Sequence, residues 1–360
     1  MYRNWLAEIK PLSNRKKLRL SEEFPEIKEL YNMKEKDLKL IPYLMEKDVT
    51  VILNAQKRSE ESLQETLEKY HEKGIKMISV QDKEYPERLK HIEDAPYILY
   101  VKGRLPEETA MSVAIVGARR CTAYGEEMAL LYGEKLGAAG VQVISGMAKG
   151  IDGAGQRGAL NSKALTYGVL GCGVDICYPR EYIGLYMDIQ EKGGIISEQI
   201  PGSPPLPAYF PMRNRIISGL SDVILVIEAK ERSGSLITAD LALEQGKDVY
   251  ALPGPVTSTA SRGCHQLIRQ GAGILLSPEE LLEELDIEAK GYGQNSVKNE
   301  KVLESTENML YSCVGLFPKS MSQLMEETGL DARKTLEVLT SLQLQGIIKE
   351  VSKNYYIRTR

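Results

Sequence analysis

The chain has 360 residues, of which 42% are hydrophobic and 27% charged, a composition typical of a soluble globular protein with two or three domains. Its formal net charge of -4 argues against a polyanion partner for the surface as a whole, so any nucleic-acid site must be a local patch. Five scattered cysteines without a C-x-x-C pair argue against structural zinc, and no apolar stretch resembles a signal peptide or a membrane span. We therefore expect a cytoplasmic protein without a membrane partner.

Residues 1–85 are rich in charge and carry leucines at helical spacing, with short breaks between the segments. This pattern predicts a small helical domain of the SAM-like kind, and Gly74 is expected to end its last helix. Residues 74–103 are expected to form an extended bridge to the next domain.

From Ser112 onward, short apolar runs rich in β-branched residues alternate with amphipathic segments. The runs are SVAIVG, VQVISG, ALTYGVLGCG, GIISEQI, DVILVIEA, DVYALPG and AGILLS. Nearly continuous apolar strands that alternate with helices are typical of a parallel sheet covered on both faces. We predict an α/β domain with a doubly wound, extended Rossmann-like parallel sheet over residues 86–286.

The last part of the chain changes character again. Residues 287–302 are polar and contain glycine, which predicts a linker. Residues 303–360 contain three helical segments followed by a hairpin-like pair of strands. This order is typical of a winged-helix domain, a variant of the helix-turn-helix.

The loops expected at the carboxyl ends of the parallel strands, where doubly wound sheets bind ligands, share one composition. They combine glycine and serine with the basic residues Arg119, Arg120, Lys149, Arg180, Arg213, Arg215, Lys230, Arg232 and Arg262. Glycine lets backbone N–H groups approach a ligand, and the arginine fork matches phosphate. We therefore expect a phosphate-rich ligand at this edge of the sheet.

No cofactor, metal or catalytic signature accompanies these loops. The stretch VGARR lacks the second glycine of a dinucleotide fingerprint, and SGMAKGID lacks the ending of a P-loop. His265 lies beside Cys264, but adjacent side chains diverge and predict no metal or catalytic pair. Ser235 does not lie in a nucleophile elbow. We expect a binding protein without cofactor, metal or catalytic residues.

The stretch FPMRNRIISGL, residues 210–220, places Arg213 and Arg215 near the expected start of a helix, where positive charge is unfavourable. Phe210 follows a loop stiffened by prolines. An aromatic ring beside two arginines suits a stacked base flanked by phosphates. In the alternative interpretation, Phe210 closes the core and the arginines pair with Glu198 or Glu228.

Six motifs, together with the preceding stretch GIKMISVQDKEYPERLKHIEDAPYILYVKG, resemble the DNA-processing protein A family (DprA, also called Smf), and the likeness covers about residues 74–285 continuously. They are AIVGARRCTAYG, VISGMAKGIDGAGQRGAL, VLGCGVDICYPRE, FPMRNRIISGLS, VIEAKERSGSLITADLALEQGKDVYALPG and SRGCHQLIRQGA. The resemblance implies a single-stranded DNA-binding protein that is not an enzyme. Such a protein protects incoming strands during natural transformation, helps to load RecA past single-strand-binding protein, and acts as a homodimer.

The loop composition and the resemblance together predict a set of DNA contacts. The predicted residues are Gly117, Arg119, Ser145, Gly146, Lys149, Arg180, Phe210, Arg213, Asn214, Arg215, Ser233, Gly234 and Ser235. Two positions depart from the family pattern, with Ala118 where serine is frequent and His265 where asparagine is common. An apolar run near the end of the sheet places Leu267 and Ile268 in a predicted dimer interface.

Two other functions stay open at this point. A nucleoside-monophosphate phosphoribohydrolase has a similar architecture, but the stretch SGSLITADLALEQ lacks the paired glycines of its signature and retains only Glu244. A duplex-DNA regulator would use residues 331–346 as its recognition helix, with Arg333 and Lys334 as the basic residues.

Overall fold

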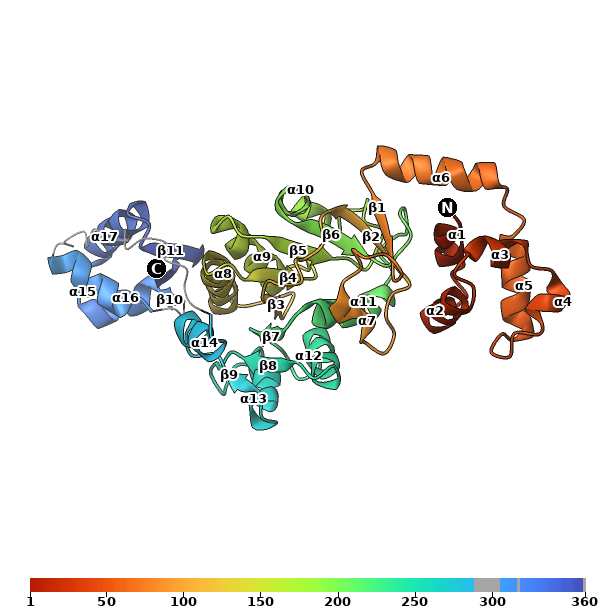
Figure 1. Cartoon of the computed structure of the whole chain (residues 1–360). Helices are drawn as coiled ribbons and strands as arrows, with labels where there is room; N and C mark the ends of the chain where they lie inside the picture. Colours follow the sequence, from red (N-terminus) through yellow and green to blue (C-terminus); the bar gives the residue numbers. More distant parts are fainter. Residues whose placement is uncertain (288–304, 316–317, 359–360) are drawn as a thin grey trace. The chain divides into compact units, whose positions relative to one another are not determined.

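A computed structural model describes residues 1–287, 305–315 and 318–358 (Figure 1). The chain forms two compact units, one made of Met1–Arg120 and Ala129–Ala289, the other of Cys121–Met128 and Lys290–Arg360. Apart from its first residue, the predicted linker 287–302 lies outside the described residues. Within the described ranges, no helix has the length and apolarity that crossing a membrane requires.

Residues 1–72, all described, form short helices that share one apolar core. They are α1 (Tyr2–Glu8), α2 (Asn14–Glu23), α3 (Ile27–Asn32), α4 (Glu35–Leu38), α5 (Glu46–Ala55) and α6 (Glu60–Glu72). Trp5, Leu20 and Ile52 are fully buried between them, in a cluster that continues into the first unit's sheet. Gly74 follows the C-cap of α6 with a φ of 65°, the left-handed conformation that glycine adopts without strain. The predicted helical segment and its final glycine are therefore present.

The first unit contains a nine-stranded sheet of order β1-β2-β6-β5-β4-β3-β7-β8-β9. Its strands are β1 (Lys76–Ser79), β2 (Ile98–Gly103), β3 (Ser112–Val116), β4 (Gln142–Ser145), β5 (Thr166–Val169), β6 (Gly194–Ser197), β7 (Val223–Val226), β8 (Asp248–Ala251) and β9 (Gly273–Ile274). Strands β3 to β9 pair in parallel and match the seven predicted runs, which confirms the Rossmann-like α/β fold. Strands β1 and β2 pair antiparallel at one edge. The sheet thus begins at Lys76, so the predicted domain boundary at residue 85 is too late.

Successive residues of β2 and of β6 face two different cores. In β2, Ile98 and Tyr100 lie in the core shared with α1 to α6, whereas Leu99 and Val101 lie in the opposite core. The helices that follow α6 along this part of the chain are α7 (Glu87–Lys90), α8 (Ala123–Ala138), α9 (Ile151–Asn161), α10 (Ile183–Lys192), α11 (Tyr209–Leu220), α12 (Gly234–Glu244), α13 (Arg262–Arg269) and α14 (Pro278–Glu284). Helices α9 and α10 lie over one face, and α11 and α12 over the other (Figure 1).

The strand order places a topological switch point between β3 and β7. From β3 the chain continues to one side through β4, β5 and β6, and then resumes at β7 on the other side of β3. The loops after β3 and β7 therefore diverge above neighbouring strands and leave a crevice between them. Ligands of open α/β sheets bind in this place.

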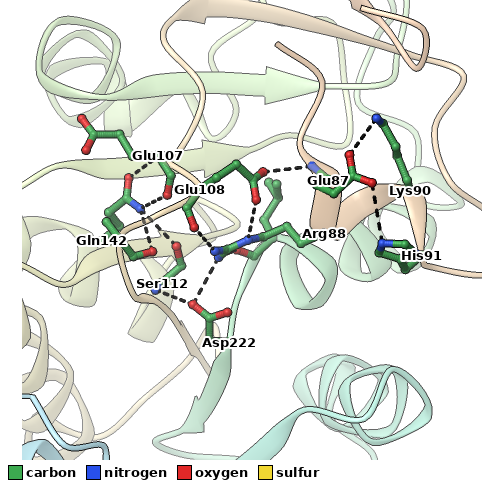
Figure 2. Close-up of polar contacts among 11 residues, drawn as sticks. Glu87, Arg88, Lys90, His91, Glu107, Glu108, Ser112, Gln142 and Asp222 are labelled. Carbon is green, nitrogen blue, oxygen red and sulfur yellow. Dashed lines mark hydrogen bonds and ion pairs between the residues drawn. The ribbon is translucent and has the colours of Figure 1, made fainter. Parts of the chain in front are cut away.

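A polar network connects the amino-terminal ends of β3, β4 and β7, on the side of the sheet opposite to the carboxyl ends (Figure 2). Arg88 of α7 donates to the carbonyl of Leu220 at 3.0 Å and contacts Asp222 at 3.2 Å. Asp222 accepts from the backbone N–H of Ser112, the first residue of β3. Gln142, the first residue of β4, donates to the Ser112 hydroxyl at 3.3 Å. Side-chain hydrogen bonds and an ion pair therefore stabilise the amino-terminal ends of these strands.

The second unit contains the three predicted helices and the predicted pair of strands. They are α15 (Ser305–Cys313), α16 (Met321–Thr328), α17 (Ala332–Leu344), β11 (Ile348–Ser352) and β12 (Tyr355–Arg358), together with the short strand β10 (Lys319–Ser320). Leu310, Leu324, Leu339 and Tyr356 form its core. The order and number of elements agree with the predicted pattern, and the winged-helix assignment stays a prediction.

Candidate nucleic-acid interface

A cleft of roughly 530 Å³ opens at the carboxyl ends of the strands, over the switch point. Its walls come from the loops after β3, β4, β5 and β7 and from the start of α11. The polar and aromatic residues that line it are Arg119, Arg120, Asp152, Tyr178, Phe210, Arg213, Asn214, Lys230, Arg232, Ser233, Ser235 and Thr238. The predicted ligand-side loops therefore do converge on one hollow.

Positive charge dominates this cleft. Five of its lining residues are basic, namely Arg119, Arg120, Arg213, Lys230 and Arg232, against the single carboxylate of Asp152. All of the basic residues except Arg213 are exposed to solvent. Lys149 lines a smaller pocket of roughly 120 Å³ formed by several of the same residues, and its ammonium group pairs with Glu181. Converging cations between low-dielectric walls attract an anionic ligand.

The aromatic side of the cleft consists of two tilted rings and an arginine that contact one another. The Phe210 ring lies 5.2 Å below the guanidinium carbon of Arg119. On another side its centroid lies 5.5 Å from that of the Tyr178 ring, which is 41% exposed. Phe210 lines the cleft instead of closing the core, in contrast to the alternative interpretation of the sequence. A flat apolar surface beside cations suits a stacked nucleobase.

The start of α12 contributes backbone donors. Ser233 is its N-cap residue, and the Ser233 hydroxyl accepts from the backbone N–H of Ser235 and lies 2.8 Å from the Ser235 hydroxyl. Asn214 of α11 donates to the carbonyl of Gly234 and so holds the two helix starts together. A helix N-terminus that opens into a cationic cleft favours an anion such as phosphate.

Arg213 carries a charge into the floor of the cleft although it is only 5% exposed. Its Nη1 donates to the carbonyl of Gly146 at 2.8 Å and to that of Val169. Burial lowers the pKa of Arg213 to about 10, and the Asp152 carboxylate acts in the opposite direction. Arg213 thus stays a cation at neutral pH. A Cβ atom on Gly146 would collide with the guanidinium, which explains why glycine stands there.

Arg215 has an internal partner, contrary to the prediction that both arginines await an external anion. It forms a bidentate ion pair with Glu198, the partner named in the alternative interpretation, at 3.0 and 2.6 Å. Helix α11 also begins at Tyr209, so Arg213 and Arg215 lie beyond its first turn. The macrodipole cost falls off within that turn, so the predicted repulsion does not apply.

Two more predicted contact residues lie elsewhere. Ser145 is fully buried, and its hydroxyl donates to the carbonyl of Ile115 at 2.6 Å, so it fastens β4 to β3 instead of facing the cleft. Arg180 is exposed in a 3-10 turn (Arg180–Tyr182) and lines neither of the two pockets. Gly117 lines the cleft as predicted, directly after β3.

Sequence reasoning missed Tyr178 as a residue of the cleft. Tyr178 was available as the aromatic residue of the loop after β5, although its contact with Phe210 is not readable from sequence. Asp152 lines the cleft too and orders the loop after β4, because its Oδ2 accepts from the backbone N–H of Gly146. Burial raises the pKa of Asp152, and the Arg213 charge acts in the opposite direction.

The predicted dimer contact at Leu267 is wrong, because this side chain is 3% exposed and belongs to the unit's own core. Ile268 is half-buried beside it. His265 contacts the carbonyl of Gly254 at 2.9 Å and so anchors its own loop. Among the described residues, no group of three or more His, Cys, Asp or Glu side chains could hold a metal ion.

Comparisons with known proteins agree with this geometry. A family model described as DNA recombination-mediator protein A matches residues 76–286. The chain is 44% identical to protein Smf of Escherichia coli over 210 residues, 58% of this chain and 56% of that protein. It is 40% identical to the DNA processing protein DprA of Bacillus subtilis over 224 residues, 62% of this chain and 75% of that protein. The chain thus spans little more than half of Smf and three quarters of the Bacillus protein.

Two solved structures have a similar fold. DNA processing protein A of Streptococcus pneumoniae superposes with a TM-score of 0.70 at 33% identity, over 79% of this chain and 97% of that one. DNA processing protein A of Helicobacter pylori, studied for its single-stranded DNA binding mode, gives a TM-score of 0.54 at 27% identity. That match covers 59% of this chain and 98% of the Helicobacter chain.

Proposed function

The chain belongs to the DNA recombination-mediator protein A family, and we therefore propose that it binds single-stranded DNA in the cleft over the switch point. The observation that carries this proposal is the combination of cations, an aromatic stack and a helix N-terminus in one hollow. Phosphates would contact Arg119, Arg213 and the start of α12, while a base stacks on Phe210. None of these groups reads base edges in a duplex groove, so we expect binding that tolerates sequence.

We further propose the role that recombination mediators play. The chain protects incoming single strands during DNA-mediated transformation and helps to load RecA onto DNA that single-strand-binding protein occupies. The family resemblance supports this role, and the open cleft is compatible with the hand-over of a strand. In this proposal the protein catalyses no reaction and acts in the cytoplasm.

The proposed assembly is a homodimer formed at the β9 edge of the sheet. Strand β9 has only two residues, of which Ile274 is 46% exposed, and Leu276, two residues further along the chain, is 68% exposed. Exposed apolar side chains close together favour burial against a second copy. Ile268, half-buried on the neighbouring helix α13, would extend that surface.

The residues that the two alternative functions would use are either far from the cleft or few in number. Glu244, the acid that a phosphoribohydrolase would need, is the last residue of α12, whereas the cleft lies at the first residues of that helix. In the second unit, α17 offers a duplex only Arg333 and Lys334 as the predicted basic residues, and Lys334 also forms an exposed pair with Glu337 at 3.2 Å.

A titration with an oligothymidylate and with a duplex of equal length tests the proposal. We expect strong preference for the single strand, with a log–log salt slope of about -0.7 per phosphate contacted. Arg119→Ala should weaken binding and reduce that slope, and Phe210→Ala should cost on the order of 1–3 kcal/mol of binding free energy. Glu191→Ala, an exposed substitution on α10 outside the cleft lining, serves as control. Equal affinity for duplex, or binding that ignores salt, would contradict the proposal.

A further inference from the structure

A buried ion pair holds α11 from outside the cleft lining. Arg215 of this helix donates to both carboxylate oxygens of Glu198, at 3.0 and 2.6 Å. Their side chains are only 10% and 8% exposed, so solvent screens the pair weakly. Arg215 Nε also donates to the carbonyl of Asp94 at 2.8 Å, which fixes the plane of the guanidinium. A rotation of α11 about its axis would break these bonds together.

The N-terminal helices reach the same ion pair through α2. Asn14, the first residue of α2, donates from Nδ2 to Glu198 Oε2 at 3.2 Å. Lys17, three residues further along the helix, is buried, and its ammonium donates to the carbonyl of Ala7. Burial lowers the pKa of Lys17 to about 8, while the nearby Glu198 carboxylate acts in the opposite direction. Glu198 is therefore held by α2 on one side and by α11 on the other.

A second link runs from the end of α6. Lys73, its C-cap residue, contacts Asp175 Oδ2 at 3.0 Å. The other carboxylate oxygen of Asp175 accepts from the backbone N–H of Gly202 at 2.7 Å. Gly202 belongs to the segment between β6 and α11. The helical segment 1–73 thus contacts the stretch 198–215 in two ways. Asn14 binds Glu198 directly, and Lys73 binds Asp175, which in turn binds Gly202.

We propose that the N-terminal helices act as a positioning element for the DNA cleft, with Asn14 and Lys73 as the positioning residues. They hold residues 198–215 in the conformation in which Phe210, Arg213 and Asn214 line the cleft. This inference rests on the proposed binding of single-stranded DNA. Because coupling is reciprocal, DNA in the cleft also strengthens the contact between the helices and this stretch.

The test uses the full chain and a fluorescent oligothymidylate, with affinity measured by anisotropy. The double variant Asn14→Ala, Lys73→Ala should bind about fivefold more weakly or worse, within the usual range for coupled sites. Its salt slope should stay unchanged, because no group that contacts phosphate is removed. Lys73→Arg should keep the affinity of the unaltered chain, because it keeps the ion pair with Asp175.

Arg3→Ala is the matched control. It removes another contact of the same helices, the pair with Asp82 at 2.5 Å, which does not lead to residues 198–215. It should bind DNA like the unaltered chain. The inference is overturned if the double variant binds equally well, or if Arg3→Ala weakens binding as much. Absence of binding by the unaltered chain would instead overturn the proposed function, and this inference with it.

Discussion

Replacing Arg215 by alanine should lower stability strongly, and DNA affinity only through the altered position of α11, without the loss of a phosphate contact. The substitution removes the bidentate partner of Glu198, whose side chain is 8% exposed, and three further donor contacts to backbone and side-chain oxygens. Breaking a buried pair by removing one partner costs about 3–5 kcal/mol, because the remaining charge stays buried. For a unit of this size, the loss lowers the thermal midpoint by on the order of 10 °C.

Calorimetry and DNA titration on the same variants separate stability from recognition. Arg215→Ala should leave the salt slope of DNA binding unchanged, whereas Arg119→Ala should reduce it by about 0.7 and leave the midpoint in place. Arg88→Ala is the comparison for a destabilised α11 without a lost phosphate contact, because Arg88 donates to the carbonyl of Leu220, the last residue of α11, and contacts Asp222 (Figure 2). Replacing both Arg215 and Glu198 by methionine should recover much of the lost stability. An unchanged midpoint with a reduced slope in Arg215→Ala would refute this reasoning and make Arg215 a phosphate contact.

Two further predictions concern pH and assembly. Burial lowers the pKa of Lys17 from 10.5 to about 8, so the unfolded chain binds more protons in this window and stability should rise with pH across it. Relative to Lys17→Met, the unaltered chain should gain on the order of 3 kcal/mol over the window in denaturant titrations, and a pH-independent difference would contradict this. At micromolar concentration, light scattering should show a dimer that Ile268→Glu dissociates, and a dimer that persists in this variant would place the interface elsewhere.

The parallel part of the fold was predictable because most of its strands, β3 to β7, are buried on both faces. The runs from Ser112 to Ile274 are therefore nearly all apolar, and each is recognisable by itself. The antiparallel edge was not predictable in the same way. Residues 98–101 form an equally apolar run, but their place in the sheet depends on pairing with β6, which lies far along the chain. Local composition carries no information about that partner.

The residues of the candidate site also fall into two groups, those predictable from local sequence and those that depend on distant partners. Residues whose function depends on backbone position, such as Gly117 and Ser233, followed from loop composition and strand order, and they do line the cleft. The position of Ser145 could not be predicted in this way, because a serine at the end of a strand can also form a hydrogen bond to the neighbouring strand. Arg215 did not follow either, since Glu198 lies 17 residues earlier on a different element. Two carboxylates, Glu198 and Glu228, were both plausible partners, and only the folded backbone selects between them.

Helix geometry explains why the two arginines of the R-N-R stretch differ in role. Residues two apart on an α-helix project about 200° from each other, so Arg213 and Arg215 cannot both face the cleft. Arg213 contributes a positive charge to the floor of the cleft. Arg215 forms an ion pair with Glu198, which fixes the rotation of α11 about its axis. Lysine could supply the charge of Arg213 but not the two-pronged contact of Arg215. The same triplet therefore provides both a ligand contact and the anchor that aims it, and single substitutions are needed to tell the two apart.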